Sequence, residues 1–164
     1  MISLIVAFCK DNHAIGLNGK IPWHIKEDLL HFKNYTQNNT VLMGDTTYFS
    51  LKSYYKDKPL PYGKIYVATI NKSLKIEGVE MVYDLSSFLS SYNKTHQDEL
   101  WICGGATIYR LSLPYVDKMI ISEVKNHYEG DTFFPYFDDE FDLIYSEERQ
   151  EFYINIYQRK ANNL

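Results

Sequence analysis

The chain alternates between two patterns of apolar residues, short continuous runs and longer segments in which apolar positions recur with the period of a helix. Continuous runs of strand length lie at residues 2–8, 40–44, 64–70, 79–83 and 99–103. Segments with helical spacing lie at residues 25–35, 46–55, 85–92 and 106–113. This alternation predicts an α/β fold with a mostly parallel central sheet flanked by helices.

The pattern changes after Pro114. A strand at residues 118–124 is followed by an acidic, aromatic loop and then by two strands, at residues 141–148 and 152–160. These two strands predict a closing antiparallel hairpin at the C-terminal end. Residues 9–23 are rich in Asn and Gly and predict a long loop without helix or sheet.

Composition limits the classes of protein to consider. A chain of 164 residues, 45% of them hydrophobic, can fill one core, so a single domain at residues 1–164 is expected. A net charge of −4 without a basic run argues against a nucleic-acid partner. The apolar segment 2–8 is too short to span a bilayer, and Cys9 and Cys103 belong to no metal-binding motif. We therefore expect no metal, no membrane contact and a cytoplasmic location.

Asp28 is the first candidate for chemistry, because it lies on the apolar side of the helix predicted at residues 25–35. At about 100° per residue it shares that side with Leu29 and Phe32, whereas Glu27 points nearly opposite. A buried carboxylate needs hydrogen-bond donors, which either a ligand or a core hydroxyl could supply. The helix alone leaves a binding role and a structural role open.

Gly104 and Gly105 join a predicted strand directly to a predicted helix. Paired glycines let a ligand approach the backbone, and free amides at a helix start favour phosphate. The segment is not the GxGxxG dinucleotide motif, so a tight turn without a ligand is an equally good interpretation.

Residues 14–23 contain two glycines and the apolar sequence Ile21-Pro22-Trp23. Such a loop could close over a site as a lid and exclude water, which suits hydride transfer. It could equally be a surface loop that Trp23 anchors to the core.

The order of these features resembles the dihydrofolate reductase family from end to end. The matching pieces are IGLNGKIPW at residues 15–23 with Asp28 five residues later, VLMG at 41–44, PLP at 59–61, GGATIY at 104–109 and EGDTFFP at 129–135. The resemblance implies a monomeric enzyme that reduces 7,8-dihydrofolate to 5,6,7,8-tetrahydrofolate with NADPH. Its product would supply one-carbon metabolism and thymidylate synthesis.

On the substrate side, the resemblance implies that Asp28 binds the 2-amino and N3 edge of the pterin and promotes protonation at N5. Ser122 matches the hydroxyl neighbour of this acid, and Trp23 and Ile21 match positions that close the catalytic site. The positions implied to line or border the pterin and aminobenzoate slot are Ile5, Ala7, Leu29, Phe32, Lys33, Leu51, Leu60, Cys103 and Tyr109.

On the cofactor side, the resemblance implies that Ala7 and Ile15 orient the nicotinamide through backbone groups and that residues 104–108 receive the pyrophosphate. The lid around Ile21 would close over the nicotinamide ring. The implied cofactor positions are Ala7, Ile15, Gly16, Gly19, Lys20, Thr46, Thr47, Thr69, Gly104, Gly105, Ala106, Thr107 and Ile108.

Two positions depart from the family at the cofactor phosphates. After VLMG the family usually has an arginine, where this chain has Asp45, and Thr107 stands where another arginine is common. The polar side chains left as phosphate partners are Thr46, Thr47, Thr69 and Lys72. We therefore expect NADPH as the cofactor, with a weakened preference over NADH.

A third departure follows PLP, where the family's arginine for the folate α-carboxylate aligns with Gly63. Lys64 is one residue away and could supply the charge, although without the bidentate geometry of a guanidinium. Lys64 is therefore the predicted, weaker anchor of the glutamate tail.

Two other functions stay open. A pyrimidine reductase of riboflavin biosynthesis shares this fold and cofactor but lacks the Pro-Trp and inward-acid opening, so Asp28 argues against it. A homologue that binds folate or nucleotide without turnover is favoured by the altered cationic positions and opposed by the intact Asp28, Trp23 and GGATIY. Oxidation of NADPH and NADH with and without dihydrofolate separates the three.

Overall fold

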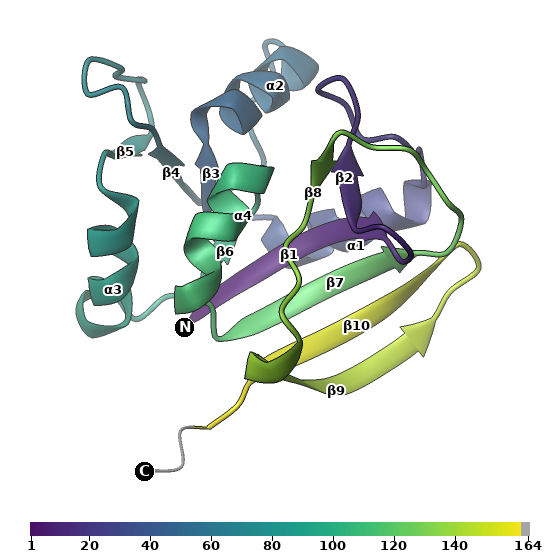
Figure 1. Ribbon diagram of the computed structural model, residues 1–164. Coiled ribbons are helices and arrows are strands. Elements are labelled where there is room, and N and C mark those ends of the chain that lie inside the picture. Colours follow the sequence, from purple (N-terminus) through teal and green to yellow (C-terminus); the bar gives the residue numbers. More distant parts are fainter. Residues whose placement is uncertain (162–164) are drawn as a thin grey trace.

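The computed structural model describes residues 1–161, and within them the predicted order of strands and helices is confirmed (Figure 1). The first half contains β1 (Ile2–Cys9), β2 (Ala14–Gly16), α1 (Lys26–Thr36), β3 (Thr40–Gly44), α2 (Asp45–Tyr55), β4 (Lys64–Ala68) and β5 (Glu80–Val82). The second half contains α3 (Leu85–Thr95), β6 (Leu100–Ile102), α4 (Ala106–Ser112), β7 (Lys118–Val124), β8 (Thr132–Phe133), β9 (Phe141–Glu148) and β10 (Phe152–Arg159). Short 3-10 helices lie at Leu113–Tyr115 and Asp138–Glu140.

One twisted sheet of eight strands runs through the described chain, in the order β5-β4-β3-β6-β1-β7-β10-β9. All neighbours from β5 to β7 are parallel. β10 is antiparallel to both β7 and β9, so the predicted closing hairpin is confirmed. The carboxyl ends of the parallel strands therefore meet at one edge of the sheet, which is the usual place for a ligand in α/β folds.

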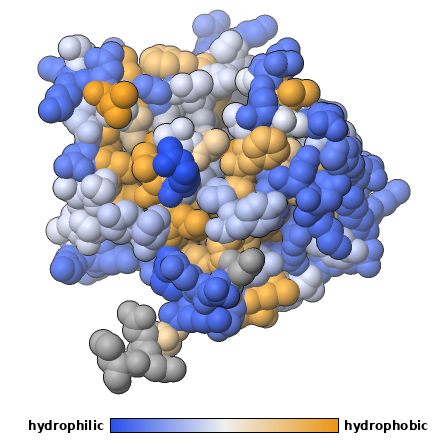
Figure 2. Space-filling model, in the orientation of Figure 1, coloured by the Kyte–Doolittle hydropathy of each residue, from blue (hydrophilic) through white to orange (hydrophobic). Residues whose placement is uncertain are grey.

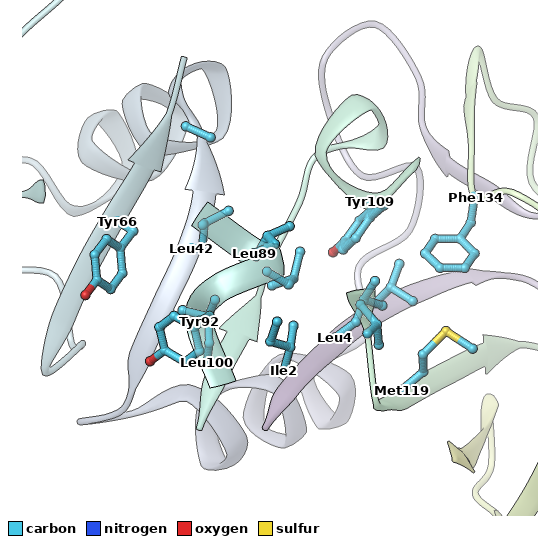
Figure 3. Packing of buried hydrophobic residues seen from close by; sticks show 14 of the residues in the cluster. Ile2, Leu4, Leu42, Tyr66, Leu89, Tyr92, Leu100, Tyr109, Met119 and Phe134 are labelled. Carbon is cyan, nitrogen blue, oxygen red and sulfur yellow. The ribbon is translucent and has the colours of Figure 1, made fainter. Parts of the chain in front are cut away.

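Two helical layers cover the sheet, because residues that alternate along each strand point to opposite faces. Leu4 and Val6 of β1 join a cluster with residues of α3 and α4. Ile5, between them, joins a second cluster that includes Phe32 of α1 and Tyr48 of α2. Figure 3 shows the first cluster, which contains Tyr66 of β4 in the sheet, Leu89 of α3 and Tyr109 of α4. Parallel strands buried on both faces explain the continuous apolar runs of the sequence.

The prediction that residues 9–23 contain no sheet was wrong. Ala14–Gly16 form β2, which pairs antiparallel with β8. Asp131 strengthens this pairing, because its backbone N–H donates to the Gly16 carbonyl over 2.9 Å. Both strands are too short to show an alternation of apolar and polar residues in the sequence. They also pair with each other across more than a hundred residues, so neither strand was predictable from its neighbours in the sequence.

The prediction that Leu29 packs on the core side of its helix was also wrong, since its side chain is 47% exposed. Asp28 and Thr36 are the buried residues of α1, and half-buried Phe32 lies between them. This row has a spacing of four residues, and Leu29 is rotated about 100° away from Asp28. The buried side of α1 is therefore narrower than the spacing of its apolar residues predicted.

The surface gives two further observations. Apolar side chains gather near the middle of the face drawn in Figure 2, around α4, and the surface toward the right of that view is mostly hydrophilic. No helix among residues 1–161 is long and apolar enough to cross a membrane.

Candidate active site

Asp28 lies in the first turn of α1, where that helix meets β1 and β7. Its side chain is buried at 8% exposure, and the Ser122 hydroxyl of β7 hydrogen-bonds to its carboxylate. Desolvation raises the pKa of Asp28, and the Ser122 bond opposes this rise. The predicted inward orientation of Asp28 is thus confirmed. Since a carboxylate offers about four acceptor positions, one hydroxyl leaves room for a ligand's donors.

Ser122 is placed by the register of the sheet. It lies directly opposite Ala7 in the parallel pair of β1 and β7, and it is almost fully buried at 2% exposure. Both residues are near the carboxyl ends of their strands. The hydroxyl beside Asp28 therefore belongs to the same sheet edge as the glycine turn after β6.

Gly104 has a backbone conformation that only glycine adopts easily, with a φ of 114°. A Cβ atom there would also come within 3.2 Å of the Tyr109 hydroxyl. That hydroxyl donates to the Ile5 carbonyl over 2.8 Å, so α4 is fastened to the centre of β1 (Figure 3). Glycine at this position therefore lets α4 pack closely against β1, and Gly105, which is half-buried, is the more open residue of the turn.

The start of α2 lies beside this turn. The Gly44 N–H donates to the Gly104 carbonyl over 2.9 Å, and a Cβ at Gly105 would lie 3.4 Å from the Thr47 hydroxyl oxygen. The structure thus brings together two groups of predicted cofactor positions, Thr46 and Thr47 in α2 and residues 104–108 at the start of α4.

Cys103 precedes the glycine pair and is buried. Its N–H donates to the Leu42 carbonyl over 2.9 Å. Burial raises the pKa of its thiol well above the usual range, so the thiol stays protonated. The Cys103 thiol is therefore no candidate nucleophile, although the resemblance places this residue at the border of the slot.

The lid contains both an anchored and an exposed residue. Trp23 is buried, with its ring centroid 5.5 Å from that of Tyr128, whereas Ile21 is 58% exposed. The Asn18 N–H donates to the Asp131 carboxylate over 3.0 Å, which ties the lid to the loop before β8. Gly19 within this lid has a positive φ of 77°. Trp23 therefore anchors this loop to the core, whereas a role of the exposed Ile21 segment as a lid stays a prediction.

The apolar wall of the site is formed by half-buried side chains from three elements. Phe32, Leu51 and Leu60 pack against a buried cluster that contains Ile5 and Cys103. Leu29 and Lys33, which the resemblance also places along the slot, are exposed on α1.

Tyr62 belongs to the same wall but was missed by the sequence analysis. It packs against the cluster that contains Cys103, and burial raises the pKa of its hydroxyl. Its position directly after the PLP segment was the available signal.

Lys64, the predicted tail anchor, is exposed and has two neighbours of its own. Its ammonium is 3.4 Å from a Glu80 carboxylate oxygen and 5.1 Å from the centroid of the Tyr66 ring. Residues 64 and 66 share one face of β4, and Tyr66 packs on the α3 and α4 side of the sheet, opposite to Phe32 and Leu60. Lys64 nevertheless lines one pocket together with Leu60 and Tyr62, so its role as the anchor stays a prediction.

The other predicted cofactor positions lie around the same edge. Thr69 follows β4 and is buried, and it donates a hydrogen bond to Asp45 rather than pointing freely into solvent. Ile15 is half-buried in β2, whereas Lys20 and Thr107 are exposed.

Among the described residues no group of three or more His, Cys, Asp and Glu side chains could hold a metal ion.

Parallel strands that end in a glycine turn, with a buried acid at the same edge, form an arrangement at which α/β proteins commonly bind a small ligand. A dihydrofolate reductase family profile matches residues 1–162. The chain belongs to the dihydrofolate reductase family, so the predicted family, fold and enzyme class are confirmed.

Individual relatives agree with this assignment. The dihydrofolate reductase of Mycoplasma genitalium is 31% identical over 150 residues, which are 89% of this chain and 91% of that protein. The dihydrofolate reductase of Buchnera aphidicola is 38% identical over 134 residues, which are 82% of this chain and 78% of that protein. A structure of dihydrofolate reductase from Enterococcus faecalis, complexed with NADP(H) and RAB-propyl, matches with a TM-score of 0.82 and 26% identity, over 98% of this chain and 97% of that one.

Proposed function

We propose that this chain reduces 7,8-dihydrofolate to 5,6,7,8-tetrahydrofolate with NADPH, and that Asp28 binds the pterin and promotes its protonation at N5. Family membership supports the reaction. The observation that carries the role of Asp28 is its burial beside Ser122, at the sheet edge that also holds the glycine turn.

Asp28 is suited to handling a proton because two influences on its carboxyl group oppose each other. Burial favours the neutral acid and raises its pKa, whereas the Ser122 hydroxyl favours the carboxylate. The paired N–H donors of a pterin would favour the carboxylate further. A group balanced in this way can exchange a proton during the reaction, which typically accelerates it about 10²- to 10⁴-fold.

The nicotinamide end of the cofactor fits the residues present. Ala7 is half-buried next to Ser122 in the sheet register, and Gly105 in the turn after β6 is half-buried as well. Ala7, Ile15 and residues 104–108 would hold the cofactor, which when bound supplies the hydride for C6 of the pterin. Tyr109 keeps α4 at the distance from β1 that this arrangement needs.

The lid contributes by excluding water. Trp23 and the Asn18–Asp131 hydrogen bond hold its two ends, and Ile21 lies at its exposed tip. An apolar tip that covers the nicotinamide would protect the reacting atoms from solvent, which strengthens electrostatic interactions inside the site.

The test is oxidation of NADPH by the purified protein with and without dihydrofolate. We expect oxidation that depends on dihydrofolate, and a loss of kcat/KM of about 10²- to 10⁴-fold in Asp28→Asn. Glu27→Gln is the matched control, because Glu27 is the adjacent acid but pairs with Arg149 over 2.7 Å on the exposed side of α1. Oxidation that needs no dihydrofolate, or equal losses in the two variants, would overturn the proposal.

The protein acts on small molecules, and we propose that it does so as a monomer in the cytoplasm, as the family resemblance implies. Gel filtration tests the first part, with elution expected at the 19.3 kDa of one chain. Elution at twice that mass would contradict it.

A further inference from the structure

The order of strands determines where the two ends of a dinucleotide lie in this chain. This step rests on the proposed function, in which the nicotinamide lies near Asp28 and Ser122 at the ends of β1 and β7. The sheet order places β6 next to β1, then β3, then β4. A dinucleotide that crosses the turn after β6 therefore has its adenosine end over the carboxyl ends of β3 and β4.

Asp45 and Thr69 occupy those two strand ends. Asp45 follows β3 directly and is the first residue of α2, and Thr69 follows β4 directly. One carboxylate oxygen of Asp45 accepts from the Thr46 backbone N–H over 2.7 Å, and the other accepts from the Thr69 hydroxyl over 2.8 Å. Thr69 is buried and in turn accepts from the Asn71 N–H over 3.1 Å.

These contacts use two of the donors that an adenosine 2′-phosphate could take. The Thr46 amide at the start of an eleven-residue helix and the Thr69 hydroxyl would suit an anion, but both donate to the chain's own carboxylate. A phosphate monoester carries a charge of about −1.5 to −2 at neutral pH, so Asp45 also repels it.

Neighbouring cations do not neutralise Asp45. Lys64 pairs with Glu80, and Lys72 interacts electrostatically with Asp84. Within residues 1–161 no lysine or arginine forms an ion pair with Asp45. A 2′-phosphate at this position would therefore face the negative charge of Asp45, which no ion pair neutralises.

The same place suits an adenosine that carries a free 2′-hydroxyl. A carboxylate accepts a hydrogen bond from a ribose hydroxyl, which is how dinucleotide-binding folds commonly select NAD over NADP. Ile70 follows Thr69 at the carboxyl end of β4, and its side chain is 98% exposed. This uncovered apolar side chain offers contact area to the purine of the cofactor.

We propose that Asp45 is a specificity-determining residue that abolishes selection for the 2′-phosphate, so that NADH and NADPH serve this chain with efficiencies within about tenfold of each other. The carboxylate accepts from the ribose hydroxyl of NADH and repels the phosphate of NADPH.

The experiment compares two probes that differ only in the 2′-phosphate, AMP and adenosine 2′,5′-bisphosphate, by calorimetric titration of the full chain. The wild-type protein binds the bisphosphate no more than about tenfold more tightly than AMP. Asp45→Asn, which keeps an acceptor oxygen for the helix start, shifts the ratio toward the bisphosphate, and Asp45→Arg shifts it further, by about 100-fold or more. The same order appears in the ratio of kcat/KM for NADPH over NADH.

Asp98→Asn is the matched control, because the Asp98 carboxylate also accepts from a threonine hydroxyl, Thr40 over 2.6 Å, but at the amino ends of the strands. It removes the same charge and leaves the binding ratio unchanged. Wild-type binding of the bisphosphate about 100-fold tighter than AMP, or equal ratios in wild type and Asp45→Asn, would overturn the inference. Because these titrations contain no dihydrofolate, they decide it even if the chain fails to reduce that substrate.

Discussion

Asp28 and Asp45 are similarly held but lie in different surroundings, at the two ends of one sheet edge. Each is in the first turn of a helix, and each accepts a hydrogen bond from the hydroxyl of a nearby strand, Ser122 or Thr69. Asp28 is buried with this one side-chain partner, whereas Asp45 is partly exposed and has a backbone N–H as well. Asp28 therefore still has acceptor capacity for a ligand in a dry place, which suits proton chemistry. Asp45 already accepts two hydrogen bonds from the protein, so it acts on a nucleotide through its charge and its remaining acceptor positions.

The surroundings of Asp28 and Asp45 thus differ in how closely their residues match the family. Around Asp28 the family's positions are present and packed together. Around Asp45 the acidic residue replaces a cation that the family usually has, and the neighbouring Thr69 hydroxyl is used to hold it. Chemistry at the pterin and selection between nucleotides are therefore separable in this protein.

The largest expected effect separates these roles. Asp28→Asn should lower kcat/KM by about 10²- to 10⁴-fold with NADPH and with NADH alike, because it affects the pterin. Asp45→Asn should instead change the NADPH to NADH ratio. Steady-state kinetics with both nucleotides measures each effect, and a changed ratio in Asp28→Asn would show that the two ends are coupled.

A smaller effect is expected at Ser122. Ser122→Ala removes the hydrogen bond that favours the Asp28 carboxylate, so the pKa of Asp28 should rise further and activity should persist to higher pH. We expect a severalfold loss of kcat/KM at neutral pH, measured across a pH series. Ser112→Ala is the matched control, since Ser112 is equally buried but its hydroxyl has no partner in the structure. If both variants keep the wild-type pH profile, Ser122 has no influence on Asp28.

The smallest effect tests whether α1 is a wall of the site. Leu29→Ala should raise the KM for dihydrofolate by up to about tenfold and cost less than about 1 kcal/mol of stability, because Leu29 is 47% exposed. Leu30 is 51% exposed and is the control. Kinetics and thermal unfolding of both alanine variants supply the data, and an equal KM in the two would remove Leu29 from the substrate slot.

The sequence predicted most of the fold because buried parallel strands have continuous apolar runs, and Asp28 because a helix has a known period. It did not predict β2 and β8, whose pairing is short and distant. The hydrogen bond between Asp45 and Thr69 was not predictable from the sequence either. Polar residues at strand ends follow no period, and these two become neighbours only because β3 lies beside β4. The partners of Lys64 were not predictable either, because Ile65 and Tyr66 are both apolar, so the sequence of that strand does not show which face of the sheet a side chain occupies.

The pH dependence of dihydrofolate reduction, measured in a single turnover by wild type and Asp28→Asn, tests the role of Asp28 most directly. Burial raises the pKa of Asp28, so its protonated form persists above the usual carboxyl range, and the wild-type rate should fall as pH rises through that pKa. In Asp28→Asn the proton must come from solvent, so the rate should keep rising as pH falls, without a plateau from this group. Profiles of the same shape in the two proteins would contradict a role for Asp28 in protonation.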